Sequence, residues 1–162
     1  MRGLRVKEGQ EVQLHLTGST TINAKRERVF QLLTDPSFIA TTLPDAVEVA
    51  LLDKESLEAK MKVKVALISS SIKVRLRITD RVPPSSARLL AEGSGSGSNL
   101  KIISTFSLEG DGTTTTRLSW VADAEITGLM AGLGSLVLRG FAEKKVGEIF
   151  AGITKGIEGA GR

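Results

Sequence analysis

The chain has 162 residues, no cysteine, one histidine (His15), and 22 Lys and Arg against 18 Asp and Glu, for a net charge of +4. This length predicts one domain that buries well over half of the surface of its unfolded chain. Without cysteines and with a single histidine, the sequence argues against disulfides, a thiol nucleophile and a conventional His/Cys zinc site. We therefore expect no metal and no cofactor.

We expect no targeting or membrane-spanning segment. The opening residues MRGLRVKEGQEVQ lack the apolar core of a signal peptide, and no run of about eighteen apolar residues occurs. We expect a cytoplasmic, soluble protein that meets the inner face of a membrane only peripherally, through surface charge. The scarcity of asparagine, limited to Asn23 and Asn99, suits a thermophile.

The first predicted strand starts at Val12 and alternates through Leu14 and Leu16 to Ile22. His15 points away from the core in this pattern. We interpret it as a solvated strand histidine, because no carboxylate or nucleophile spacing that would support catalysis accompanies it.

Two short helices are predicted next. Val29, Leu32 and Leu33 form a helical stripe that ends at Asp35-Pro36, because a residue before proline avoids the α region. A second piece, residues 37–42, follows. We expect the two helices to cover one end of a sheet.

Residues 57–78 predict a hairpin that turns at Ser69-Ser70. The pattern pairs Leu67 with Ile72, Val65 with Val74, Val63 with Leu76 and Met61 with Ile78, which places every apolar side chain on one face. It also sets Lys64 opposite Arg75 and Lys62 opposite Arg77, which is unfavourable. The basic face comprises Lys60, Lys62, Lys64, Lys73, Arg75 and Arg77.

Two interpretations of this basic face stay open. The cations either splay into water and reach acids such as Glu58 and Glu92, or they contact an anionic membrane or an acidic protein. Nucleic acid is not an expected partner, because no aromatic side chains interleave with the cations.

Two further hairpins are predicted over residues 87–108 and on to 126. We interpret the Gly-Ser run at 93–98 as a mobile hairpin tip and not an anion site, because no helix starts behind it. Ser104 lacks a base and is interpreted as a hydroxyl bonded to a neighbour or a water. Trp120 is read as core in preference to a stacking surface for a ring ligand.

Residues 127–157 read as one long helix with two apolar stripes. Leu129, Met130, Leu133, Leu136, Val137, Gly140 and Phe141 cluster on one side, and Val146, Ile149, Phe150, Ile153 and Ile157 on nearly the opposite side. One straight helix does not bury both against one sheet. Either it bends at a hinge between Gly140 and Gly147 that could gate the interior, or another subunit or the two short helices cover its second half.

This order of elements predicts an α+β fold in which a seven-stranded, curved antiparallel sheet encloses an apolar cavity against the terminal helix. The predicted cavity lining is Met61, Val63, Val65, Val74, Leu76, Leu89, Ile102, Ser104, Phe106, Trp120, Ala122, Leu133 and Val137. We predict no catalytic residue in it.

Five short motifs resemble the carbon monoxide dehydrogenase G-subunit family, of the START-like, helix-grip superfamily typified by the birch-pollen allergen. They are Thr34-Asp35-Pro36, Leu43-Pro44-Asp45, Glu92-Gly93, Thr116-Arg117-Leu118-Ser119-Trp120 and Gly128-Leu129-Met130-Ala131-Gly132-Leu133-Gly134. The resemblance implies a helix-grip domain, an apolar cavity without universal catalytic residues, and an accessory role beside a carbon monoxide dehydrogenase at the membrane. Because the sequence ends at Arg162, we expect it to lack the extended C-terminal tail of some members.

We assign residues 1–11 to an N-terminal extension, 12–157 to the domain and 158–162 to a tail. Three functions stay open. The chain is a non-enzymatic carrier of a lipid or quinone-like molecule, an assembly or membrane-recruitment accessory of a redox enzyme without its own ligand, or a START-like hydrolase or cyclase. A carrier predicts an apolar cavity of about several hundred Å³.

Overall fold

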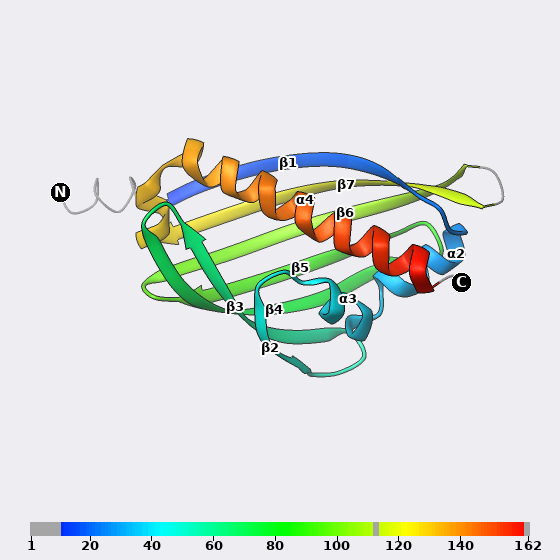
Figure 1. Ribbon diagram of the computed structural model, residues 1–162, viewed down its shortest axis with the longest axis horizontal. Helices are drawn as coiled ribbons and strands as arrows, with labels where there is room; N and C mark the ends of the chain where they lie inside the picture. The colour runs from blue at the N-terminus through cyan, green and yellow to red at the C-terminus, as the bar shows by residue number, and fades with distance from the viewer. Residues whose placement is uncertain (1–10, 112–113, 161–162) are drawn as a thin grey trace.

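The fold is a single antiparallel sheet wrapped around a long helix, in a computed structural model that describes residues 11–111 and 114–160. The strands lie in the order β1-β7-β6-β5-β4-β3-β2. In Figure 1 the sheet curves beneath the helix α4, and α2 and α3 close one end. The predicted α+β helix-grip architecture is confirmed. The strands are β1 (Glu11–Ile22), β2 (Ala46–Leu51), β3 (Ser56–Val65), β4 (Ile68–Val82), β5 (Ser86–Gly95), β6 (Ser98–Asp111) and β7 (Thr115–Gly128).

The two short helices follow β1 as predicted, with α2 at Arg26–Leu33 and α3 at Pro36–Thr42. Thr34 caps the end of the first helix, and Asp35 caps the start of the second. Its carboxylate accepts a hydrogen bond from the backbone N–H of Ser37 at 2.9 Å, and Pro36 occupies the first helical position, where a missing N–H costs nothing.

The register of the β3–β4 hairpin differs from the predicted one. Val65 lies opposite Ile68 and Met61 opposite Ile72, so the chain turns at Ala66 and Leu67 and not at Ser69-Ser70. Ala66 takes the left-handed conformation that this tight turn needs, with φ of 55°. The slip is an even number of residues, so the apolar side chains of the strands keep the predicted face, whereas Leu67 lies in the turn and is exposed.

The corrected register also changes the predicted charge pairs. Lys64 faces Ser69 and Lys62 faces Ser71, so the predicted pairs with Arg75 and Arg77 are wrong. Arg75 instead lies opposite Glu58, and Nη2 of Arg75 is 3.3 Å from Oε2 of Glu58. For Arg75, the interpretation that the cation pairs with an acid of the same chain is therefore confirmed.

The terminal helix begins later than predicted. Strand β7 runs to Gly128, a 3-10 turn η1 (Leu129–Leu133) follows, and α4 spans Ser135–Ala160. Gly128 and Gly134 have φ of 88° and 89°, a region that glycine enters without a Cβ penalty, and they separate the three elements. The helix also includes residues 158–160 of the predicted tail.

This late start changes which side chains of the first half of α4 face the sheet. Leu138 is 3% exposed and packs inward, whereas Leu136 is 85% exposed and Val137 is 43% exposed. The predicted inward placement of Leu129, Leu136 and Val137 is therefore wrong, because η1, in which Leu129 is 63% exposed, and Gly134 interrupt the single helical phase that the prediction assumed.

The second half of α4 packs on the two short helices. Ile153 and Ile157 are buried in one cluster with Val29, Phe30 and Ile39. Gly156 allows the Phe38 ring to lie 3.0 Å from the place that a Cβ would occupy. The alternative in which α2 and α3 cover this stripe is confirmed, and the helix runs unbroken through Gly140 and Gly147. A gating role for these glycines stays a prediction.

Candidate ligand-binding interior

Cross-strand rows of side chains form the wall of the concave face. One row joins Leu16, Ala122, Ser104 and Leu89 across β1, β7, β6 and β5, and the next joins Leu14, Ala124, Ile102, Ala91 and Leu76. Directly opposed residues in a sheet share a face, so the register collects the predicted apolar residues of β4 to β7 on one wall.

The apolar core consists of two separate buried clusters, one toward each end of this wall. The first lies under α2, α3 and the end of α4 and includes Ile22, Phe106 and Leu118. The second lies under η1 and the start of α4 and includes Val12, Val65 and Leu138. The core is therefore closed at both ends of the molecule.

Between the two clusters much of the wall is only half-buried, although Leu14 and Ala91 of the same rows are buried. Leu16, Val74 and Ile102 face the interior but remain partly accessible, although they lie in the middle of the concave face. In a solid core these central positions would be the most buried ones, because interiors are close-packed. The middle of the interior is thus less filled than its ends.

Small side chains mark the same central region. Ala122 and Ala124 of β7, Ser104 of β6 and Ala91 of β5 occupy the two central rows. The adjoining row toward α2 instead carries Trp120 and Phe106. The residue sizes therefore match the incomplete filling between the clusters.

An open groove leads to this region between β1 and α4. Its volume is about 600 Å³, and its lining includes Gly18, Trp120 and Phe150. The Trp120 and Phe150 rings stack with centroids 5.1 Å apart and planes inclined by 16°. A Cβ on Gly18 would lie 2.5 Å from Cζ2 of Trp120, so glycine lets the indole lie against β1. Arg139 and Glu143 of α4 are charged residues of the lining.

The predicted lining residues are brought together with one exception. The eleven predicted strand residues lie on the concave wall, and Leu133 of η1 is partly buried beside the second cluster. Val137 is exposed and does not belong to the wall. Sequence reasoning missed Leu16 and Gly18, although their alternation with His15 placed them on the inner face of β1. It put Phe150 on the side of α4 away from the sheet.

The hydroxyl of Ser104 is already used within the sheet. Its Oγ donates to the backbone carbonyl of Val121 at 3.0 Å, which confirms the interpretation of a hydroxyl bonded to a neighbour. In the described part of the chain, the groups with a clearly displaced pKa lie elsewhere. The Glu55 backbone N–H lowers the pKa of Asp53, and the hydrogen bond to Asp45 raises the pKa of Lys145.

His15 lies on the outer side of β1, as predicted, but it has a carboxylate partner. Its Nδ1 lies 2.6 Å from Oδ1 of Asp123, which is opposite it on β7, and both side chains are more than half exposed. The sequence does not predict this pair, because His15 and Asp123 are far apart in the chain and become neighbours only when β1 pairs with β7.

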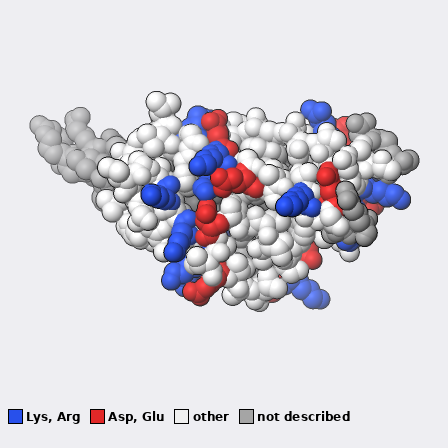
Figure 2. All heavy atoms as spheres, viewed as in Figure 1, with Lys and Arg blue, Asp and Glu red and all other residues white. Residues whose placement is uncertain are grey.

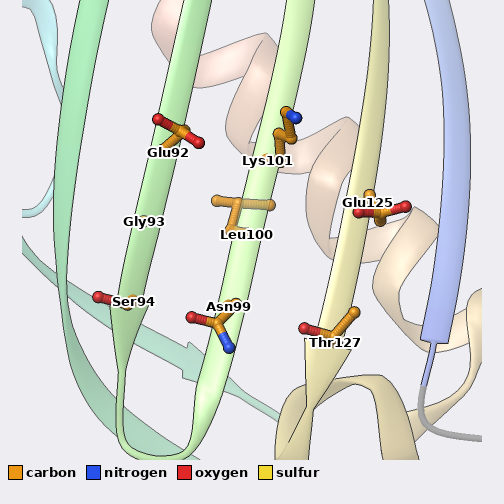
Figure 3. Close-up of a pocket in the computed structure, with 8 residues that line it drawn as sticks. All are labelled: Glu92, Gly93, Ser94, Asn99, Leu100, Lys101, Glu125 and Thr127. Carbon is orange, nitrogen blue, oxygen red and sulfur yellow. The ribbon is translucent and has the colours of Figure 1, made fainter.

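A second depression, on the convex face, is polar. Figure 3 shows its lining residues on β5, β6 and β7, with α4 on the far side of the sheet. Glu92, Lys101 and Glu125 stand opposite one another there, and Arg75 continues the row beyond Glu92. Alternating charges stabilise a sheet surface, so this face suits water better than an apolar ligand. The predicted Gly-Ser tip is mostly strand, with its turn at Ser96 and Gly97.

No helix among the described residues is both long and apolar enough to cross a bilayer. The same residues contain no group of three or more His, Cys, Asp or Glu side chains placed to hold a metal ion.

A curved antiparallel sheet that grips a C-terminal helix over an apolar interior defines the START-like, helix-grip class. A conserved protein from Geobacillus kaustophilus superposes with a TM-score of 0.83 at 23% identity, covering 92% of this chain and 98% of that one. The Zhui aromatase/cyclase from Streptomyces sp. R1128 superposes with a TM-score of 0.64 at 15% identity, covering 91% of this chain and 94% of that one. A START superfamily protein from Mycobacterium smegmatis superposes with a TM-score of 0.59 at 14% identity, covering 91% of this chain and 96% of that one.

Residues 18–158 match the family model of the carbon monoxide dehydrogenase G subunit (CoxG), and the chain belongs to this family. No curated protein matches the chain in sequence. The structural likenesses, all at low identity, show the fold alone.

Proposed function

We propose that the chain binds an apolar small molecule, of the lipid or quinone class, between the concave wall and α4, and that it catalyses no reaction on it. The observation that carries the proposal is the half-buried central wall between two closed clusters. Apolar side chains that stay partly accessible inside a fold gain free energy, at about 25 cal/mol per Å², when an apolar ligand covers them.

The groove between β1 and α4 supports the same proposal because it offers an entrance. Trp120 and Phe150 present aromatic surface, and Arg139 and Glu143 supply polar groups near it. Ligand sites typically combine a mainly apolar lining with a few polar groups that fix orientation. A molecule with an apolar body and one polar end fits this combination.

Membership of the CoxG family supports an accessory role beside a carbon monoxide dehydrogenase-type redox enzyme in the cytoplasm. An accessory without its own ligand is the alternative within this role. It predicts a partner enzyme that copurifies, and an interior that stays empty.

A hydrolase or cyclase is the second candidate, because a relative in fold is an aromatase/cyclase. Proton transfer in such an enzyme needs a titratable group inside the cavity. The central rows of the concave wall carry Ser104 as their hydroxyl, and it is bonded to Val121. This favours binding over catalysis.

Native mass spectrometry of protein purified from its own source, followed by lipid extraction, tests the proposal. We expect one apolar molecule per chain, and a higher Tm on adding quinones or fatty acids to the stripped protein, because a ligand that binds only the folded state stabilises it. Recovery of no apolar compound together with an unchanged Tm would refute the carrier function.

A further inference from the structure

Three uncharged segments meet at the end of the molecule that carries η1. They are residues 65–72 around the β3–β4 turn, 93–100 around the β5–β6 turn, and 126–138 from the end of β7 to the start of α4. The Leu129 backbone N–H donates to the Gly97 carbonyl at 3.1 Å, and the Met130 N–H donates to Ser98 Oγ at 2.9 Å. Val65 and Ile68 belong to the same cluster as Met130. We name this end, made by the three segments, the uncharged cap.

Large apolar side chains protrude from the uncharged cap. Leu67 is 101% exposed, Leu136 is 85% exposed, Leu129 is 63% exposed and Val137 is 43% exposed. Figure 2 shows this left-hand end, where Figure 1 places η1 and the start of α4, without charged side chains among its described atoms. Contiguous exposed apolar surface of this kind marks an interaction site.

Four cations and three anions border the uncharged cap, and, within the described part of the chain, lysines without an ion pair gather on the β3–β4 hairpin. The charged residues next to its three segments in the chain are Lys64, Lys73, Lys101 and Arg139 against Glu92 and Glu125, and Glu11 lies opposite Thr127. Lys60 and Lys73 face each other on the hairpin that ends at Leu67, and Lys62 and Lys64 face serines. Among the described residues, none of these four lysines has an ion pair, whereas Arg75 further back is paired with Glu58.

We propose that the uncharged cap docks on an anionic phospholipid bilayer, with Leu67, Leu129 and Leu136 entering the interface and the hairpin lysines lying at the phosphates. Only Val65 separates Lys64 from the turn at Ala66 and Leu67, about 7 Å of strand rise, which lies within the depth of about 5–10 Å to which interfacial segments bury their apolar face. Cations at that distance behind an apolar tip meet the headgroups as the tip enters the acyl region.

The shape of the cap favours a bilayer over a protein partner. Leu67 stands at the apex of a two-residue turn and Leu136 in the first turn of α4, so both project outward from convex features. A protein partner would need pockets shaped to each of them, whereas a bilayer accepts protruding leucines without such complementarity. The inference rests on the proposed function, because a carrier of an apolar molecule must meet the phase in which that molecule dissolves.

Sedimentation with lipid vesicles tests the docking without any ligand. We expect the full chain to bind vesicles of phosphatidylcholine mixed with phosphatidylglycerol, and to bind pure phosphatidylcholine vesicles far more weakly. The paired change Leu67→Ser and Leu136→Ser should lower the partition at least tenfold, because two leucines no longer leave water. The pair Lys62→Gln and Lys64→Gln should lower it roughly fivefold for each lysine at low salt.

Two control variants carry the same types of substitution outside the uncharged cap. Leu51→Ser with Leu52→Ser changes exposed leucines at the end of β2 and just after it, and Lys54→Gln with Lys155→Gln removes exposed lysines outside the cap. Both should leave vesicle binding unchanged. Absence of sedimentation, equal binding to both vesicle types, or equal losses in control and cap variants would overturn the docking. Ligand titration in vesicle-free solution shows separately whether the proposed binding function holds.

Discussion

Phe150 of α4 stacks on Trp120 of β7, with ring centroids 5.1 Å apart, and so joins the helix to the sheet beside the half-buried central wall. Trp120 is the one tryptophan of the chain, which has no tyrosine. Its emission therefore reports on the surroundings of this one side chain. The stack marks the boundary between the closed cluster under α2 and α3 and the incompletely filled region.

Replacing Phe150 by alanine should destabilise the fold by about 1–3 kcal/mol. This cost is smaller than that usual for a fully buried aromatic side chain, because Phe150 is partly exposed. The Trp120 emission maximum should shift to the red as water reaches the indole. Urea unfolding followed by this emission measures both effects. A variant with unchanged emission and stability would show that the two rings are not in contact in solution.

Gly18→Ala should cost about 1–3 kcal/mol, because its Cβ would lie 2.5 Å from the Trp120 ring and force it to move. Gly140→Ala is the matched control. Nothing lies within 4 Å of a Cβ there and the position is helical, so alanine should stabilise by about 0.5–1 kcal/mol. Equal effects at the two sites in denaturant titrations would contradict the close approach of Trp120 to β1.

Gly140→Ala combined with Gly147→Ala also tests the predicted hinge. The helix is continuous through both positions, so we expect ligand exchange rates in stopped-flow fluorescence to stay as in the wild type. Exchange that slows severalfold would instead establish that α4 bends there to admit the ligand.

Lys145 links α4 to the turn before β2, and this link should weaken at high pH. Its Nζ donates to Asp45 Oδ2 at 2.6 Å, and this hydrogen bond raises the pKa of Lys145 above 10.5. A raised pKa in the folded state means that the stabilisation is complete below 10.5 and is lost as the pH rises through the folded value. The gain is about 0.5–1 kcal/mol, as for surface ion pairs.

Asp45→Asn should therefore reduce the free energy of unfolding at neutral pH, with the difference from wild type vanishing in strongly alkaline solution. Asp80→Asn breaks a more exposed surface pair with Arg88 and serves as the control. If wild type and Asp45→Asn differ in free energy of unfolding by the same amount at neutral pH and in strong alkali, the stabilisation does not come from the charge of Lys145.

If the central region is hollow, enlarging its small residues should be tolerated. Ala122→Leu and Ala124→Leu each add apolar volume next to partly accessible side chains, so we expect no loss of stability or a gain of up to about 1 kcal/mol. In a filled core the same change would cost about 1–3 kcal/mol. Ala59→Leu, at a residue buried in the first cluster, provides the overpacked comparison.

The sequence predicts the sheet well because strand alternation is a local signal. Residues 12–22 and 57–65 alternate without interruption, and the Asp35-Pro36 stop separates α2 from α3 as expected. The wall of the candidate site follows from the same alternation, since an even register slip leaves each side chain on its face.

What the sequence could not give depends on backbone conformation and long-range pairing. Ala66 adopts a positive φ that alanine rarely takes, so the Ser69-Ser70 pair misplaced the turn. Gly134 could equally be helical or left-handed, and choosing the helix misplaced Leu136 and Val137. Phe150 meets Trp120, and His15 meets Asp123, only after the sheet and helix assemble.

A titration of Trp120 emission with an isoprenoid quinone tests the central claim, that the space between the concave wall and α4 accepts an apolar molecule. We predict saturable quenching at one quinone per chain, and weaker binding in an Ala122→Leu, Ala124→Leu variant whose interior is filled. Quenching that rises linearly without saturation and is identical in wild type and filled variant would contradict the claim.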